Sequence, residues 1–159
     1  MDKSVFSEKD WKDYAAKNAV LVTLDFPKDD SIVPEKYKGR NRELQTQFGV
    51  GGYPTYVVLD TDGKSILGKL GAGRDKTPAS FIKEFQGLIK LSAGSVAAYV
   101  KSNPDKADAY KKAISELKES KDALKTWLAT RPKRTPENTK KFEAFNKRIK
   151  DATGKFETF

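Results

Sequence analysis

The chain has 159 residues, and its 31 Lys and Arg against 22 Asp and Glu give a formal net charge of +9. It contains no cysteine and no histidine, which excludes thiol redox chemistry, the usual zinc sites, and Ser-His or Cys-His catalysis by these residues. We therefore predict no catalytic residue, no metal site and no cofactor. No apolar run approaches the roughly 20 residues that span a bilayer, so we also predict no membrane partner.

The first two predicted elements are a helix and a buried strand. Residues 10–17 form a short helix, with Trp11, Tyr14 and Ala15 on one face at spacings of three and four residues. Residues 19–26, AVLVTLDF, are a near-continuous apolar run rich in branched side chains, which is typical of a strand buried on both faces. A helix followed by such a strand favours an α/β fold with a parallel sheet.

A loop and a short helix are predicted next. Pro27 ends the strand, and the polar residues that follow as far as Gly39 predict a loop. Asn41 is a suitable N-cap for a helix, and Gly49 is a suitable residue to end it. The sequence thus places one short helix between these two positions.

A β-hairpin and a further helix complete this half of the chain. Residues 56–59 predict a strand, residues 65–70 predict its antiparallel return, and the Asp-Gly pair in residues 60–63 is a strong hairpin signal. Thr77 and Pro78 then start a helix in the usual order of cap and proline.

The two halves of the chain differ in charge. Residues 1–91 hold 15 basic and 13 acidic side chains, whereas residues 92–159 hold 16 and 9. In the second half a long helix starts at Asn103, the segment RPKR at 131–134 makes a bend, and a second helix follows. We therefore predict two domains, residues 1–91 and a basic α-helical hairpin at 95–159.

Apolar stripes predict how this hairpin packs. The inward positions of its first helix are Ala107, Tyr110, Ile114, Leu117, Leu124 and Leu128. Those of its second helix, which we expect to end before Gly154, are Phe142, Phe145, Ile149 and Ala152.

Several segments of the first domain together resemble one family. VLVTLDFP at 20–27, ELQTQFGVGGYPTYVVLDTDGK at 43–64, LGAG at 70–73 and the helix at 78–91 follow the order found in bacterial thioredoxin-like disulfide oxidoreductases. The resemblance covers residues 5–91. It implies an incomplete thioredoxin-like α/β fold, a mixed sheet with a cis-proline loop and a terminal β-hairpin, and it implies a thiol-disulfide oxidoreductase ancestry.

The same resemblance assigns a role to the loop YPT. Pro54 would be the cis-proline of the fold, and the backbone of Tyr53, just before it, would pair with an extended protein segment. Tyr53, Pro54 and Thr55 are therefore the candidate binding residues. The alternative is a plain turn that leads the chain into its strand.

The chain departs from the family at its start. A W-C-x-x-C motif and a central strand would lie upstream of Met1, so these residues are not catalytic as they stand, and residues 19–26 and 55–59 would have open edges. Open edges predict a homo-oligomer. Two origins stay open: a longer exported oxidoreductase, placed in the periplasm or secreted, or a cysteine-free binding or scaffold module. The absence of an export signal in the chain as written favours the cytoplasm.

Basic residues around the bend are candidates for polyanion binding. They are Arg131, Lys133, Arg134, Lys140, Lys141, Lys147 and Arg148. The alternative, a solvated helix face, is favoured, because a run of charges more often has that role. Phe142 and Phe145 fall on the apolar stripe, so we interpret them as core residues and not as stacking platforms for bases. Nucleic acid is therefore a disfavoured partner.

Overall fold

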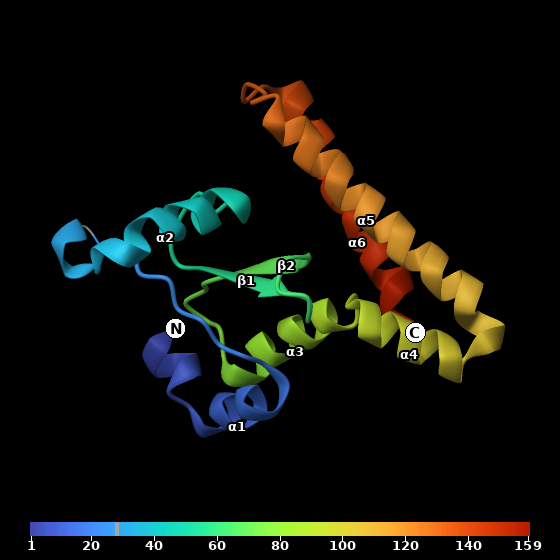
Figure 1. Cartoon of the computed structure of the whole chain (residues 1–159). Coiled ribbons are helices and arrows are strands. Elements are labelled where there is room, and N and C mark those ends of the chain that lie inside the picture. The colour runs from blue at the N-terminus through green and yellow to red at the C-terminus, as the bar shows by residue number, and fades with distance from the viewer. Residues whose placement is uncertain (28) are drawn as a thin grey trace. The chain divides into compact units, whose positions relative to one another are not determined.

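A computed structural model describes residues 1–27 and 29–159 of the chain (Figure 1). These residues form two compact units, 1–92 and 93–159. Helices predominate, and the sheet of the described residues has two antiparallel strands. This mixture of helix and sheet is compatible with the predicted α/β class. No helix in the described part of the chain is both long enough and apolar enough to cross a membrane.

The described part of the first unit begins with helices and helical turns, continues with a β-hairpin and ends with a helix. In chain order they are a π-helical turn η1 (Asp2–Phe6), α1 (Lys9–Asn18), a 3-10 turn η2 (Asp30–Ile32), α2 (Glu35–Gln47), β1 (Thr55–Leu59), β2 (Ile66–Gly71) and α3 (Pro78–Ile89).

The predicted β-hairpin is confirmed. β1 pairs antiparallel with β2, with Thr55 opposite Gly71 and an irregularity after Val58. The turn is closed by a hydrogen bond from the Asp60 N–H to the Ser65 carbonyl at 2.8 Å. Gly63 has a φ of 66°, a conformation that glycine adopts without a steric penalty.

The predicted start of α3 is also confirmed. The Thr77 hydroxyl accepts a hydrogen bond from the Ser80 N–H, and the Ser80 hydroxyl accepts one from the Thr77 N–H, with Pro78 in the first turn. This reciprocal cap satisfies two backbone donors that would otherwise lack partners. The cap fixes the N-terminal end of α3, the helix on which the buried Phe81 lies.

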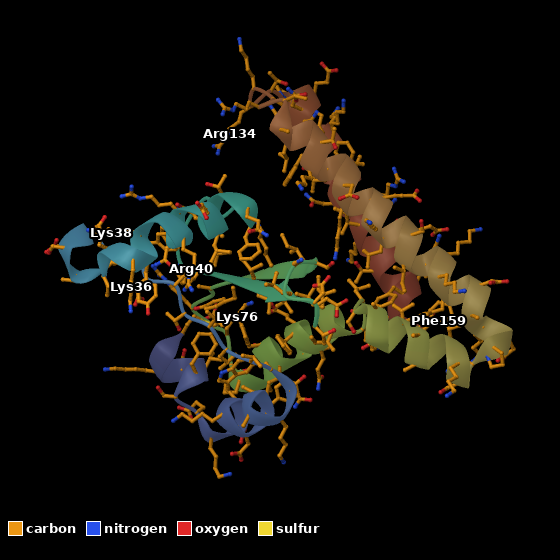
Figure 2. All side chains as sticks on the ribbon, in the orientation of Figure 1. Lys36, Lys38, Arg40, Lys76, Arg134 and Phe159 are labelled. Carbon is orange, nitrogen blue, oxygen red and sulfur yellow. The ribbon has the colours of Figure 1, made fainter. Side chains whose placement is uncertain are left out.

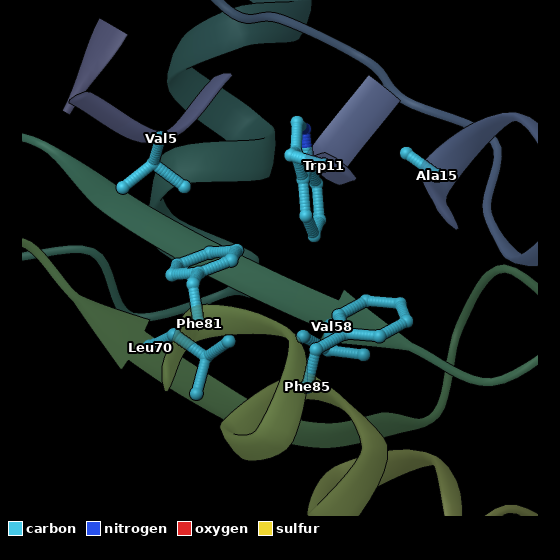
Figure 3. Packing of buried hydrophobic residues seen from close by; sticks show 7 residues of the cluster. All are labelled: Val5, Trp11, Ala15, Val58, Leu70, Phe81 and Phe85. Atoms are coloured by element: carbon cyan, nitrogen blue, oxygen red, sulfur yellow. The ribbon is translucent and has the colours of Figure 1, made fainter. Parts of the chain in front are cut away.

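The core of the first unit combines aliphatic side chains with closely packed aromatic rings. Figure 3 shows its seven buried side chains converging from η1, α1, both strands and α3; they are Val5, Trp11, Ala15, Val58, Leu70, Phe81 and Phe85. Phe81 packs edge-on against Trp11, with ring centroids 5.0 Å apart, and also against Phe6 and Tyr56. Such edge-to-face pairs stabilise by about 0.5 to 1.5 kcal/mol beyond the burial of their area.

The prediction of a buried strand at residues 19–26 is wrong. This segment has no strand pairing, and Val20 is 93% exposed, with Leu21 and Val22 also exposed. An apolar run forms a strand only when neighbours supply hydrogen bonds and cover its faces, and no described strand lies beside this one. The predicted parallel sheet is therefore absent from the described residues.

The loop predicted for residues 27–39 is also partly wrong. α2 begins at Glu35, directly after Pro34, and continues through Gly39. Asn41 is therefore not an N-cap but a buried residue inside the helix. The Gly39 in mid-helix, which costs only about 1 kcal/mol, made the sequence resemble a break.

The second unit is entirely helical. It contains α4 (Ala93–Ser102), a 3-10 turn η3 (Pro104–Lys106), α5 (Ala107–Ala129) and α6 (Pro136–Glu157). The predicted hairpin corresponds to α5 and α6, and α4 was not predicted. Gly154 does not end α6, because the helix continues to Glu157.

The packed end of this hairpin lies away from its bend. Tyr110 of α5 stacks on Phe156 of α6, with ring centroids 5.7 Å apart and the planes 23° from parallel. The ring centroid of Tyr99 of α4 lies 4.1 Å from that of Tyr110. The Lys155 ammonium contacts the Glu116 carboxylate at 2.9 Å and holds the pKa of that carboxyl below its usual range. Near the bend, by contrast, Leu128 and Phe142 are exposed, so both predictions of core burial are wrong.

Candidate functional site

The predicted loop at Tyr53 is reached through a well-defined helix end. After α2 the Val50 N–H bonds to the Gln45 carbonyl at 2.9 Å, and the Gly49 N–H bonds to the Thr46 carbonyl at 3.0 Å. These two bonds, with Gly49 at a φ of 55°, form the common glycine-based end of a helix. The Lys69 ammonium of β2 donates to the Gly49 carbonyl at 2.6 Å, so the helix end is also attached to the hairpin.

The side chain of Tyr53 is held from two directions. Its ring stacks on Phe26 with centroids 5.1 Å apart and planes 23° from parallel. Its hydroxyl accepts a 2.6 Å hydrogen bond from the side-chain amide of Gln45. The Tyr53–Pro54 peptide bond is cis. Tyr53 nevertheless remains 56% exposed, so a fixed residue faces solvent here.

The main chain of Tyr53 has no partner within the part of the chain that the structure describes. Neither its N–H nor its carbonyl takes part in a hydrogen bond there. The neighbouring backbone is organised, since the Thr55 hydroxyl donates to the Gly52 carbonyl at 2.6 Å and Thr55 begins β1. The loop therefore presents a donor and an acceptor at the entrance to a strand.

β1 itself has room for a further strand. It pairs with β2 along one edge, and no third strand joins the sheet in the described ranges. Tyr53 lies two residues before Thr55, the first residue of β1. An extended segment that paired with Tyr53 could thus continue along the other edge of β1.

A cavity of about 640 Å³ is lined in part by Phe26, the residue whose ring stacks on Tyr53. It is lined by Thr23, Asp25, Phe26, Pro27, Ile32, Val33, Pro34, Tyr37, Arg40 and Asn41. The Asn41 side-chain nitrogen lies 3.4 Å from the Asp25 carbonyl, and its buried oxygen lacks a hydrogen-bond partner among the described residues. Sequence analysis missed this cavity, because it placed Asn41 at a helix end and Phe26 in a sheet.

The predicted polyanion residues all belong to the second unit. Arg131, Lys133 and Arg134 lie between α5 and α6, and the remaining four lie on α6; every one is exposed. Tyr53, Pro54 and Thr55 belong to the first unit, so each set of predicted residues is described within its own unit.

The groups of the first site are ones that can bind a partner. The chain has no thiol and no imidazole, and no cluster of three or more potential metal ligands occurs among the described residues. What the loop supplies is a fixed aromatic ring, a hydroxyl and main-chain hydrogen-bonding groups. Sequence analysis identified Tyr53 and Thr55 but gave no signal for Gln45, whose contribution depends on the course of the chain after α2.

The chain resembles a known thiol-disulfide reductase over part of its length. It is 28% identical over 91 residues to the disulfide bond reductase DsbH of Chlamydia pneumoniae, a match that covers 57% of this chain and 53% of the reductase. The chain therefore spans about half the length of this curated relative. No family model and no solved structure matches. The likeness supports a relationship to thioredoxin-like proteins of the thiol-disulfide oxidoreductase kind.

Proposed function

We propose that residues 1–92 are a thioredoxin-like unit that holds an extended polypeptide segment at Tyr53, Pro54 and Thr55. The observation that carries the proposal is the state of Tyr53. Its side chain is fixed by Phe26 and Gln45, while its main-chain N–H and carbonyl have no partner among the described residues.

The physical basis is strand addition. An extended segment that pairs with exposed main-chain groups gains affinity from hydrogen bonds, whichever side chains it carries. Because Tyr53 is already fixed, little conformational entropy would be lost at the loop when the segment binds. The open edge of β1 would lengthen the same ladder beyond Thr55.

Thiol-disulfide exchange is not part of the proposed activity of these residues. The nucleophile of that reaction is a thiolate, and the chain contains no cysteine. The unit would therefore contribute recognition of the polypeptide, as half of a redox site whose thiols are supplied elsewhere or as a binding module alone.

The test is a binding titration with the full chain. A fluorescein-labelled, S-alkylated unfolded polypeptide serves as the probe, because alkylation removes any contribution from its thiols. Fluorescence anisotropy should show saturable binding that weakens several-fold in Tyr53→Ala and in Pro54→Ala. Ile66→Ala, which removes an exposed apolar side chain from the other strand of the same hairpin, is the matched control and should bind normally.

Equal affinities for the wild type, Tyr53→Ala and Pro54→Ala would remove the loop from the proposed function. Amide chemical shifts in the same titration add a second readout. Shifts confined to residues outside 48–59 would also count against the proposal.

A further inference from the structure

The tip of the α5–α6 hairpin concentrates positive charge. Residues 125–148 contain eight Lys and Arg and two Glu, so these 24 residues supply +6 of the net charge of +9. None of the ion pairs formed between described residues uses any of these eight cations. The tip, defined here as residues 125–148, therefore has cations that are available to an external anion.

The loop of the tip is held by local hydrogen bonds. The Arg131 N–H bonds to the Leu128 carbonyl at 3.0 Å, and Arg131 has a φ of 51°. On the other side, the Thr135 hydroxyl accepts from the Asn138 N–H, and the Asn138 side-chain amide donates to the Lys133 carbonyl at 2.9 Å. Figure 2 shows the Arg134 side chain extending away from the two helices. The basic side chains are thus mounted on an ordered loop.

Aromatic rings lie next to these cations. The ring of Trp127 of α5 stacks with that of Phe142 of α6, with centroids 6.4 Å apart, and its centroid lies 5.5 Å from that of Phe145. The Lys141 ammonium lies 5.9 Å from the Trp127 ring centroid. Phe142 is 41% exposed, whereas sequence analysis interpreted it as core. The objection to nucleic-acid binding that rested on this burial therefore no longer applies to Phe142.

The cations continue along α6 beyond the loop. Lys140 and Lys147 are seven residues apart, as are Lys141 and Arg148, which places members of each pair on the same face about 10.5 Å apart along the helix. A row of charges of this length can contact several phosphates of one polynucleotide strand, whereas a single small anion would reach only part of it.

We propose that the hairpin tip binds single-stranded nucleic acid. Arg131, Lys133 and Arg134 contact phosphates at the loop, the basic residues of α6 extend the track, and a base stacks on the exposed face of Phe142. This combination of a basic track with an aromatic platform is the general mode of sequence-independent single-strand binding. The proposal concerns the second unit and does not depend on the polypeptide site of the first.

An anionic membrane surface fits the tip less well. The large hydrophobic side chains exposed in the described part of the second unit are Leu128 and Phe142, a small area to insert between lipids. Of these two, Phe142 lies on α6, and its ring is stacked on Trp127. The extended row of cations favours a polymer of phosphates.

The experiment measures binding of the full chain to a fluorescein-labelled 20-residue oligothymidylate at several salt concentrations. Single-strand affinity should fall with salt, with a log-log slope of about −0.7 for each phosphate contacted. The triple variant R131A/K133A/R134A should flatten that slope by about 2, since it removes three such contacts. The control K111A/K112A/K118A removes three exposed cations of α5 outside the tip and should keep the wild-type slope.

A second variant separates stacking from charge. Phe142→Leu retains an apolar side chain but removes the ring, and it should weaken single-strand binding several-fold while leaving the salt slope unchanged. Circular dichroism of each variant verifies that the helices persist.

Two results would overturn the proposal. One is equal salt slopes for the wild type and R131A/K133A/R134A. The other is absence of oligothymidylate binding in 50 mM salt while the chain cosediments with vesicles containing phosphatidylserine, which would assign the tip to a membrane surface instead.

Discussion

The side-chain amide of Gln45, in the last turn of α2, donates a 2.6 Å hydrogen bond to the hydroxyl of Tyr53 in the following loop. This bond and the stacking on Phe26 both fix the Tyr53 ring. We predict that Gln45→Ala weakens binding of the S-alkylated polypeptide by a factor of about 2 to 5, because the loop must then be ordered on binding. Isothermal calorimetry should show the loss as a less favourable entropy.

Gln47→Ala is the control for this prediction, because Gln47 lies on the same helix end and is exposed. An identical loss of affinity in both variants would indicate a general effect on α2 and not a role for the bond to Tyr53.

The aromatic core predicts where the first unit is most vulnerable. Phe81 is 2% exposed and contacts the rings of Phe6, Trp11 and Tyr56. Phe81→Ala should lower the free energy of unfolding by about 3 to 5 kcal/mol, since it leaves a cavity among rings that cannot close around it. Urea unfolding followed by circular dichroism measures the change. Phe142→Ala, at an exposed position, should change stability far less, and comparable losses in the two variants would contradict the assignment of the core.

The hairpin turn predicts a dependence on pH. The Asp62 carboxylate accepts hydrogen bonds from the Ser65 hydroxyl and N–H and from the Lys64 N–H, which lower its pKa to about 2. The unfolded-state value is about 3.9, so the stabilisation is fully present above about pH 4 and is lost as pH falls through about 2. Asp62→Ala should therefore lower the thermal midpoint at pH 6 and have little effect at pH 2. A difference from wild type that is constant over this range would show that the carboxylate charge has no part in the turn.

The exposed apolar segment predicts self-association. Val20 and Val22 are exposed, and β1 has one unpaired edge in the described residues, a combination that favours pairing with another chain. We propose that the chain forms concentration-dependent homo-oligomers through the exposed segment at residues 19–26 and the open edge of β1. Val20→Lys with Val22→Lys should shift the chain toward the monomer in light scattering after size exclusion. Leu128→Lys, an exposed apolar position in the second unit, should leave the distribution unchanged; if it alone dissolved the oligomer, the contact would belong to the hairpin.

The features that the sequence predicted correctly are set by local interactions. The turn at Gly63, the cap at Thr77 and the helix end at Gly49 each depend on residues within five positions along the chain. Turn and cap chemistry of this kind is visible in a short window of sequence.

The errors have non-local causes. Residues 19–26 have the composition of a strand, but a strand requires a hydrogen-bonding neighbour, and composition does not reveal whether one is present. In the same way, the stripe that includes Leu128 and Phe142 has helical spacing, yet the hairpin buries Tyr110 and Phe156 at its other end more completely. Gln45 and Phe26 joined the candidate site through folding that no short window could show.

The two tryptophans of the chain lie in different units and in different surroundings. Trp11 is 4% exposed within the aromatic core, whereas Trp127 is partly exposed beneath a lysine ammonium. Their emission should differ accordingly, short in wavelength for Trp11 and longer for Trp127. The protein thus carries a natural optical reporter for each half, and Trp11→Phe or Trp127→Phe would allow the melting of one half to be followed without any added label.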